Sequence, residues 1–293
     1  MSELSKRVWV GVILAPLTLV IVFMGGAALA GLLAVASAIA AWEFYRIARA
    51  AGHEPLSDLG CAIAGLIPLA VHARYLGLYQ PRYGVLALVV ILIMCVALWA
   101  RGATGKPLAA VATTLMGAIY TGGLLSFAYA MRYHDYAVDG ARVGSVAIAA
   151  GGVLLGLPVL LTWATDTGAF QVGRALGGRK LMPTVSPGKT ISGAIGGLVA
   201  AVIVAWLYTR YALRPAAQLA FTPLGLIVFA TVVSVVGQIG DLFESLLKRE
   251  AGVKDSSRLI PGHGGVLDRL DSLFFVLPVA YVLMGWLLIP APR

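Results

Sequence analysis

A series of long apolar runs, separated by short polar segments, constrains this chain more than any other feature. A hydrocarbon core about 30 Å thick is crossed by about 20 helical residues. The runs of roughly that length lie at 8–25, 26–42, 60–73, 83–100, 108–131, 146–165, 192–212, 222–240 and 272–290. A mean hydropathy of +0.90 excludes an ordinary soluble domain. We therefore expect an all-α, polytopic integral membrane protein with about nine transmembrane helices, of which 60–73 is the weakest because it is short and contains His72.

The net charge of +9 could indicate a nucleic-acid partner, but the positions of the cations suggest another cause. If the N-terminus is cytoplasmic and the chain alternates sides, most lysines and arginines fall in the cytoplasmic segments. That bias sets the orientation of membrane proteins. The sequence therefore predicts a multi-pass protein of the cell inner or plasma membrane, with its active site on the cytoplasmic face and no nucleic acid bound. Cys61 and Cys95 lie in or beside apolar spans, so they form no zinc motif or disulfide framework.

The polar chemistry is concentrated in the second half of the chain. Up to about residue 160 the spans consist mainly of Gly, Ala, Leu and Val, which suits close helix packing. Two polar loops follow, at 166–193 and 248–272, both on the predicted cytoplasmic side. A helical hairpin separates them, so they can meet at one cavity. We therefore predict an N-terminal packing part, 1–160, and a C-terminal catalytic part, 161–293.

The second loop, "KREAGVKDSSRLIPGHGGVLDRLDS", is dense in ionisable groups although only 12% of the chain is charged. At the end of the preceding span, four polar residues at i, i+3, i+4 and i+7 share one helix face. These residues are Asp241, Glu244, Ser245 and Lys248. Ionisable groups at a span end that face a bundle interior are candidates for function.

The carboxylates of this region predict a metal site. Asp268 and Asp271 share a helix face at the start of the last span. If Asp241 and Asp268 came within about 4 Å, they would repel by about 4 kcal/mol at an effective dielectric constant of 20. A divalent cation removes that repulsion, and ligands that are all oxygen favour Mg²⁺. The alternative is that the acids only pair with arginines of the same loop, namely Arg249, Arg258 and Arg269.

The stretch "SPGKT" at 186–190 resembles the end of a nucleotide-binding phosphate loop. The first glycine of that motif would fall at residue 183, which is Pro183, and we expect no strand before the loop. We therefore reject the nucleotide-hydrolase fold. Ser186, Lys189 and Thr190 can still hold phosphate oxygens. Since no acid lies within several residues of Lys189, this ammonium is either a solvated charge in a basic loop or a partner for substrate phosphate.

The stretch "PGHGG" at 261–265 places His263 among three glycines and a proline. Such a backbone can turn sharply and approach a ligand closely. A direct substrate role and a structural role for His263 both remain open at this point.

Residues 245–271 resemble the signature of the phosphatidate cytidylyltransferases, also called CDP-diacylglycerol synthases. The matching positions are Ser245, Lys248, Arg249, Lys254, Asp255, Pro261, His263, Gly264, Gly265, Asp268, Arg269 and Asp271. The stretch from Trp163 to Gly193 is similar to the second motif of the family, and "RV" at 7–8 and "WEFYRIA" at 42–48 also fit. Gly188 stands where the family usually has a second lysine, and Ser192 where it has an acid.

The resemblance implies a membrane nucleotidyltransferase of phospholipid biosynthesis. Such an enzyme joins CTP to phosphatidic acid and forms CDP-diacylglycerol and diphosphate, by positioning and electrostatics rather than strong base catalysis. We expect phosphate-neutralising or catalytic roles for Lys189, Lys248, Arg249, Lys254, His263 and Arg269. We expect substrate binding by Asp166, Ser186, Thr190, Ser245 and Asp255, with Asp166 also a candidate supporting acid. We expect Mg²⁺ on Asp241 and Asp268, supported by Asp271.

Several alternatives stay open. A relative that uses another lipid phosphate, such as an isoprenoid-ether one, would look the same, because contacts to membrane lipids are generic apolar residues. A CDP-alcohol phosphotransferase is disfavoured, because the Asp-Gly and Ala-Arg pairs of that family are missing around Asp268. A transporter would more naturally show charges within spans or paired broken helices. The sequence leaves open a second cation and a homodimer.

Overall fold

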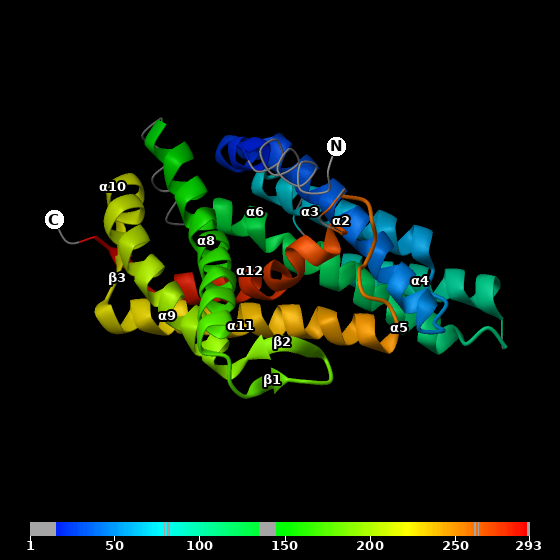
Figure 1. Ribbon diagram of the computed structural model, residues 1–293. Helices are drawn as coiled ribbons and strands as arrows, with labels where there is room; N and C mark the ends of the chain where they lie inside the picture. The colour runs from blue at the N-terminus through cyan, green and yellow to red at the C-terminus, as the bar shows by residue number, and fades with distance from the viewer. Residues whose placement is uncertain are drawn as a thin grey trace. The chain divides into compact units, whose positions relative to one another are not determined.

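The structure is a computed structural model that describes residues 16–78, 80, 83–102, 104–134, 145–260, 262 and 264–291. It is mostly helical, with two short strand pairs that the sequence did not predict (Figure 1). The chain forms two compact units, each described here by itself. The first is built mainly from Gly26–Tyr129 and Leu247–Leu270, and the second mainly from Ala130–Leu246 and Asp271–Arg293.

The first unit is organised around close contacts between helices. Its elements are α2 (Gly26–Ala50), α3 (Ser57–Tyr75), α4 (Tyr83–Arg101), α5 (Pro107–Ala118) and the π-helix η1 (Ile119–Gly123). The ring of Tyr45 lies over two glycines, because a Cβ at Gly60 or Gly117 would come within 2.1 or 2.3 Å of it. Tyr45 Oη donates a hydrogen bond of 2.7 Å to the carbonyl of Thr114. Small residues thus let α2, α3 and α5 approach, as is common in membrane helix pairs.

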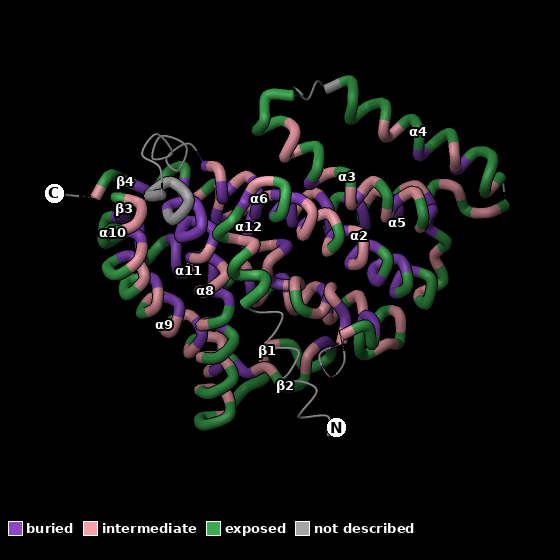
Figure 2. Tube along the Cα trace, turned by 90° about the horizontal axis from the view of Figure 1, so that it is seen from above, coloured by how far each residue is buried: buried purple, intermediate pink, exposed green. Residues whose placement is uncertain are grey.

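Most residues of helix α4 are exposed (Figure 2). Ile93 and Ala97 are buried with Leu56 in a small core. Large apolar side chains on the rest of the helix are exposed, among them Leu86, Leu88, Leu92, Leu98 and Trp99. An apolar surface of this kind is unfavourable in water and suits a hydrocarbon surrounding.

The second unit contains a tightly packed helix pair closed by a β-hairpin. Helix α8 (Ser145–Leu176) runs beside α9 (Ile191–Tyr208), and strands β1 (Lys180–Met182) and β2 (Ser186–Thr190) connect them as an antiparallel pair (Figure 1). Glycines line the contact: a Cβ at Gly168 would lie 2.6 Å from that of Ala200, and one at Gly197 would lie 2.7 Å from the carbonyl oxygen of Thr165. The sequence "SPGKT" is therefore a strand, where we expected a loop.

The remaining elements complete the two units. Helix α6 (Phe127–Arg132) carries the chain from the first unit into the second. The π-helix η3 (Thr209–Leu213), helix α10 (Arg214–Ala217) and strand β3 (Leu219–Phe221) follow α9, and β3 pairs with β4 (Leu288–Pro290). Helix α11 (Pro223–Glu250) belongs to the second unit up to Leu246, and helix α12 (Leu267–Leu287) belongs to it from Asp271 onward.

The described residues contain seven helical segments long and apolar enough to cross a membrane, where the sequence predicted about nine spans. They confirm the predicted spans 26–42, 83–100, 108–131, 146–165, 192–212, 222–240 and 272–290. The third predicted span is a helix, α3, but it is not one of the seven; Asp58, His72 and Arg74 lower its mean hydropathy. The first, 8–25, lies partly outside the described residues, and its described part from 16 to 24 is helical. The chain is thus a mostly helical, multi-pass integral membrane protein. The functional division at about residue 160 stays a prediction.

Candidate active site

The β-hairpin fixes the start of helix α9 through Thr190. Its backbone is extended, and its side-chain oxygen accepts a hydrogen bond of 3.1 Å from the backbone N–H of Gly193. Thr190 is therefore the N-cap of the helix, an arrangement that stabilises a helix by about 1 kcal/mol. Ser192 donates to the carbonyl of Gly177 and lies 3.1 Å from the Thr190 hydroxyl. Ser192, where the family usually has an acid, thus ties the end of α8 to the start of α9.

Lys189 forms an ion pair with Asp241 of helix α11. The distance between Lys189 Nζ and Asp241 Oδ2 is 2.5 Å, and the two side chains are 27% and 32% exposed. The other oxygen of Asp241 accepts a long hydrogen bond of 3.4 Å from Ser245 Oγ. The sequence predicted that the Lys189 ammonium is either solvated or a partner for substrate phosphate. That prediction was incomplete, because it did not include an ion pair with Asp241. The partner of Lys189 comes from a helix far along the chain.

Asp268 is the centre of a second polar cluster, within the first unit. Its oxygen Oδ1 accepts a hydrogen bond of 2.8 Å from Lys248 Nζ, and the side chains of Lys248 and Asp268 are only 12% and 7% exposed. Its oxygen Oδ2 accepts from Ser256 Oγ at 2.9 Å and from the backbone N–H of Gly265 at 2.8 Å. Several donors therefore converge on one largely buried carboxylate. For Asp268, Lys248 at the end of α11 supplies a salt bridge.

Glu43, on helix α2, is a site residue that the sequence analysis missed. Its side chain is fully buried. It accepts hydrogen bonds from the hydroxyls of Ser256 and Ser257 and from the backbone N–H groups of Val266 and Leu267. The available signal was an acid directly after the apolar run 26–42, in the stretch "WEFYRIA". Its contacts could not be read from the sequence because they join residues more than 200 positions apart.

The two last glycines of "PGHGG" allow the loop to pass close to these carboxylates. A Cβ at Gly265 would lie 2.0 Å from Ser256 Oγ and 2.4 Å from Glu43 Oε1. Gly264 has a φ of +83°, and a Cβ there would lie 2.7 Å from Asp268 Oδ2. Only glycine fits such positions without displacement of its neighbours. The close approach is therefore to the carboxylates of the protein itself. Pro261 and His263, like Arg7 and Val8, lie outside the described residues.

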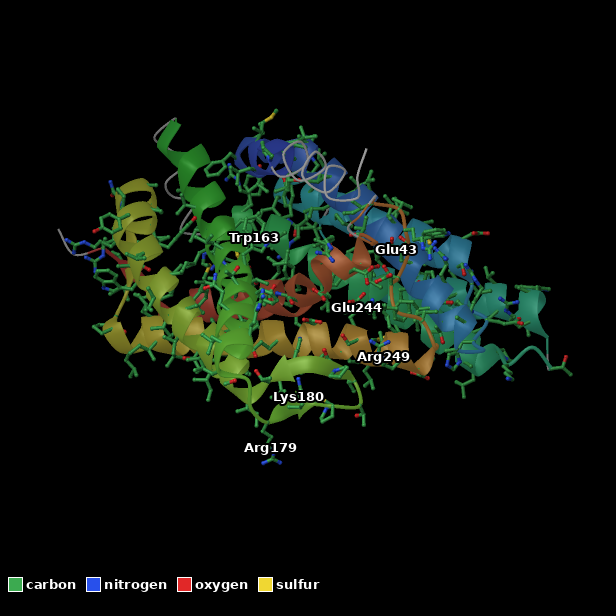
Figure 3. The ribbon with its side chains drawn as sticks, viewed as in Figure 1. Glu43, Trp163, Arg179, Lys180, Glu244 and Arg249 are labelled. Atoms are coloured by element: carbon green, nitrogen blue, oxygen red, sulfur yellow. The ribbon has the colours of Figure 1, made fainter. Side chains whose placement is uncertain are left out.

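The other predicted site residues fall into two groups by exposure. Five are exposed, namely Asp166 on α8, Arg249 near the end of α11, Lys254 and Asp255 in the following segment, and Arg269 on α12. Three are partly buried, namely Ser186, Ser245 and Asp271. Figure 3 shows Arg179 extending away from the hairpin, and Lys180 beside it is also exposed.

The described residues do not form a cluster that supports the predicted metal site. Over the ranges that the structure describes, no three side chains of His, Cys, Asp or Glu gather into a metal-binding group. Asp271 accepts a hydrogen bond of 2.6 Å from the backbone N–H of the next residue, Ser272. The joint metal site of Asp241, Asp268 and Asp271 therefore stays a prediction.

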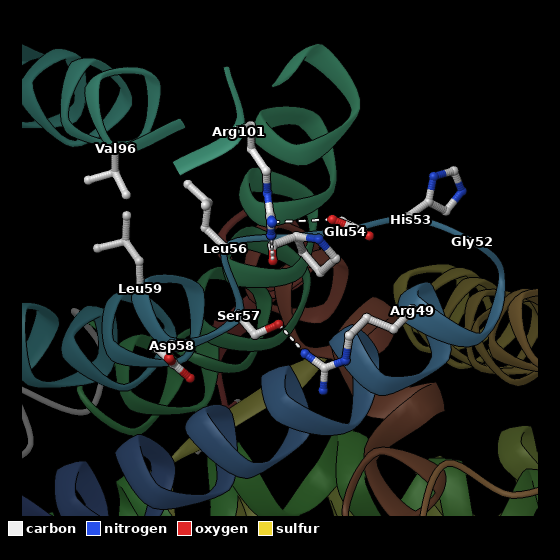
Figure 4. Close-up of a pocket in the computed structure, with 11 residues that line it drawn as sticks. Arg49, Gly52, His53, Glu54, Leu56, Ser57, Asp58, Leu59, Val96 and Arg101 are labelled. Atoms are coloured by element: carbon white, nitrogen blue, oxygen red, sulfur yellow. Dashed lines mark hydrogen bonds and ion pairs between the residues drawn. The ribbon is translucent and has the colours of Figure 1, made fainter. Parts of the chain in front are cut away.

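A separate pocket of about 780 Å³ lies in the first unit, where α2 ends and α3 begins (Figure 4). Two of its cations have partners within the lining: Arg101 pairs with Glu54 at 3.2 Å, and Arg49 donates to the hydroxyl of Ser57. None of the described residues of the two polar motifs lines it. We therefore place the candidate chemistry at the lysine–aspartate pairs rather than in this pocket.

The fold and these pairs define a multi-pass membrane protein with lysine–carboxylate pairs in both of its polar segments. The Cytidylyltransferase family matches residues 5–287, nearly the whole chain, and the chain belongs to this family. This finding confirms the resemblance drawn from the motifs.

Curated relatives include proteins named phosphatidate cytidylyltransferase. The one from Bacillus subtilis (strain 168) is 46% identical over 126 residues, which are 43% of this chain and 45% of the relative. The one from Haemophilus influenzae is 48% identical over 120 residues, 41% of each chain. The one from Staphylococcus haemolyticus is 46% identical over 130 residues, 43% of this chain and 46% of the relative. The chain thus aligns with less than half the length of these relatives.

Proposed function

We propose that the protein is a phosphatidate cytidylyltransferase. An oxygen of the phosphate group of phosphatidic acid attacks the α-phosphorus of CTP, the bond to the β-phosphate breaks, and CDP-diacylglycerol and diphosphate form. Family membership over residues 5–287 and the names of the relatives support this reaction class. The structural observation that carries the proposal is the lysine–aspartate pairing at both polar motifs. It supplies cations for phosphate and oxygen ligands for a metal from the same small set of residues.

The cations would bind the phosphate groups. The partly exposed Lys189 can exchange its contact with Asp241 for a phosphate oxygen, since ion pairs of this exposure are weak. Lys254 and Arg269 are exposed to incoming substrate, and Arg249 lies on the end of α11. Ser186 and Ser245 are hydroxyl donors of the same two motifs. We propose that Lys248 does not exchange its partner for phosphate as Lys189 does. Its ammonium stays paired with the largely buried Asp268 and holds the orientation of that carboxylate.

We also propose Mg²⁺ as the cofactor. The donors of the motifs are carboxylate and hydroxyl oxygens, and Mg²⁺ in proteins is often held by one or two carboxylates together with substrate phosphates. Asp241 fits such a ligand because its carboxylate is about one-third exposed, and its described contacts are a partly exposed ion pair with Lys189 and a long hydrogen bond from Ser245. From the sequence we retain Asp268 as the second ligand and Asp271 as support. When bound, the metal would neutralise charge on the reacting phosphates.

The membrane position of the reaction follows from the same proposal. The lysine and arginine distribution supports a cytoplasmic location for both polar motifs. CTP would enter from the cytoplasm, and the lipid would enter sideways from the bilayer.

The test is a transfer assay with the purified full-length protein in detergent. With cytosine-labelled CTP, Mg²⁺ and phosphatidic acid, we expect label to enter the lipid fraction. Omission of phosphatidic acid, or chelation of Mg²⁺, should abolish the transfer. Transfer to an isoprenoid-ether phosphate but not to phosphatidic acid would replace the proposed substrate. No transfer to either lipid would refute the proposed reaction.

A further inference from the structure

We propose that Glu43 is a positioning residue for the reaction: it holds Ser256 and Ser257 together with the start of α12, and thereby orients Asp268. This inference rests on the proposed function. The described hydrogen bonds of Glu43 come from Ser256, Ser257, Val266 and Leu267, none of which is expected to bind substrate. It acts on Asp268 through Ser256.

The contacts of Glu43 explain how a buried charge is tolerated. Burying an ionised carboxylate is costly unless donors satisfy it. Glu43 Oε2 accepts from Ser256 Oγ at 3.1 Å and from the Leu267 N–H at 2.6 Å. Its Oε1 accepts from Ser257 Oγ and from the Val266 N–H at 3.1 Å. Two hydroxyls and two backbone amides thus surround one carboxylate.

The two amides lie at the N-terminus of helix α12, which begins at Leu267. The first N–H groups of a helix have no partner within the helix, and negative charge is stabilised there by the helix dipole. Glu43 therefore caps α12 although 224 positions separate it from Leu267. A local N-cap residue fixes only its own turn, whereas this one attaches α12 to helix α2.

Ser256 links this cap to Asp268. Its hydroxyl oxygen lies 3.1 Å from Glu43 Oε2 and 2.9 Å from Asp268 Oδ2. A hydroxyl has one hydrogen to donate, so the two carboxylates share it. The backbone N–H of Ser256 also lies 3.1 Å from Asp268 Oδ2. A shift of Ser256 would therefore change the surroundings of Asp268.

Gly265 supports the same inference independently. Any side chain at this position would collide with Ser256 Oγ and Glu43 Oε1. The loop is thus shaped around the carboxylate of Glu43.

The key variant is Glu43→Gln, which keeps the shape and removes the charge. Its amide group would place N–H donors against the donors of the segment, so the segment should loosen. We expect kcat to fall by about tenfold or more, while KM for CTP changes less than about threefold. The variant would lose the orientation of Asp268 that the transition state requires, but it would keep the groups that bind substrate. Glu43→Asp retains the charge and should recover part of kcat. Glu54→Gln is the control, since Glu54 is an acid of the same unit that is 70% exposed.

The structural readout is amide hydrogen exchange of the purified full-length protein without substrate. Glu43→Gln should lose protection at Val266 and Leu267 and keep protection in the middle of α2, whereas Glu54→Gln should match the wild type at both. If Glu43→Gln does not fold, Ser257→Ala tests the same contact. It removes one hydroxyl and should show the same local loss, with a decrease in kcat of about threefold.

The outcomes separate this inference from the proposed function. Lost protection at 266–267 together with a lower kcat supports it. Unchanged kcat in Glu43→Gln, with or without lost protection, overturns it. A wild-type protein that transfers no label to lipid refutes the proposed function and with it the catalytic part of the inference. In that case the hydrogen-exchange experiment still decides whether Glu43 holds Val266 and Leu267 in place.

Discussion

The Lys189–Asp241 pair and the Lys248–Asp268 pair have the same chemistry but differ in their surroundings. In the first, both side chains are about 30% exposed, and Asp241 has one further, long hydrogen bond from Ser245. In the second, both are nearly buried, and Asp268 also accepts from Ser256 and Gly265. Exposed ion pairs stabilise a protein by about 0–1 kcal/mol, whereas breaking a buried pair by removing one partner costs about 3–5 kcal/mol. The first pair can open easily for a ligand, and the second holds one orientation.

The largest expected loss of activity comes from substitution of Asp241 or Asp268, and the double variant tests whether the two act together. Asp241→Asn and Asp268→Asn should each nearly abolish lipid labelling, because each removes a proposed Mg²⁺ ligand. If the two act as one unit, the double variant should be little worse than either single variant. Multiplicative losses would indicate separate functions.

The same variants sharpen the comparison through stability. Asp268→Asn should lower the thermal unfolding midpoint in detergent, because an amide group would meet the N–H groups of Ser256 and Gly265. Asp241→Asn should leave the midpoint almost unchanged, because its pair with Lys189 is partly exposed. Equal shifts would remove the distinction between the two pairs.

A smaller but specific effect is expected at Lys189. Lys189→Ala should lower kcat/KM for CTP by about 100-fold, equivalent to roughly 2.7 kcal/mol, if the ammonium stabilises phosphate charge in the reaction. The unfolding midpoint should barely change. Lys180→Ala is the matched control, since Lys180 lies in the same hairpin and is exposed. Equally mild effects of both substitutions at subsaturating CTP would identify the hairpin as a plain basic connection.

The smallest expected effect concerns stability at Gly265. A methyl group there would lie 2.0 Å from Ser256 Oγ, so Gly265→Ala should reduce the free energy of unfolding by about 1–3 kcal/mol, as overpacking does. Activity should fall as well, because Ser256 contacts Asp268. The control is Gly31→Ala in helix α2, where a Cβ would meet no atom within 4 Å. A Gly265→Ala protein as stable as Gly31→Ala would show that the loop has room to shift.

The sequence by itself determined the environment and the family of this protein. Hydrophobic length is a local property, so seven of the predicted spans appear as helices long and apolar enough to cross a membrane. Asp58, His72 and Arg74 explain why α3 does not join them. The motif residues around Lys248 and Asp268 identified the family, because the spacing of a motif, like the length of an apolar run, is visible in the sequence itself.

Only the tertiary structure decided which charges meet. Lys189 has no acid nearby in the sequence, and its partner Asp241 comes from another helix. Glu43 follows an apolar run and reads as an ordinary end of a span, yet it accepts hydrogen bonds from Ser256, Ser257, Val266 and Leu267. The glycines at 264 and 265 indicated a close approach, but the approaching groups were the carboxylates of Asp268 and Glu43. Periodicity and spacing describe neighbours along the chain, whereas the energy of a buried charge depends on donors that folding brings from distant segments.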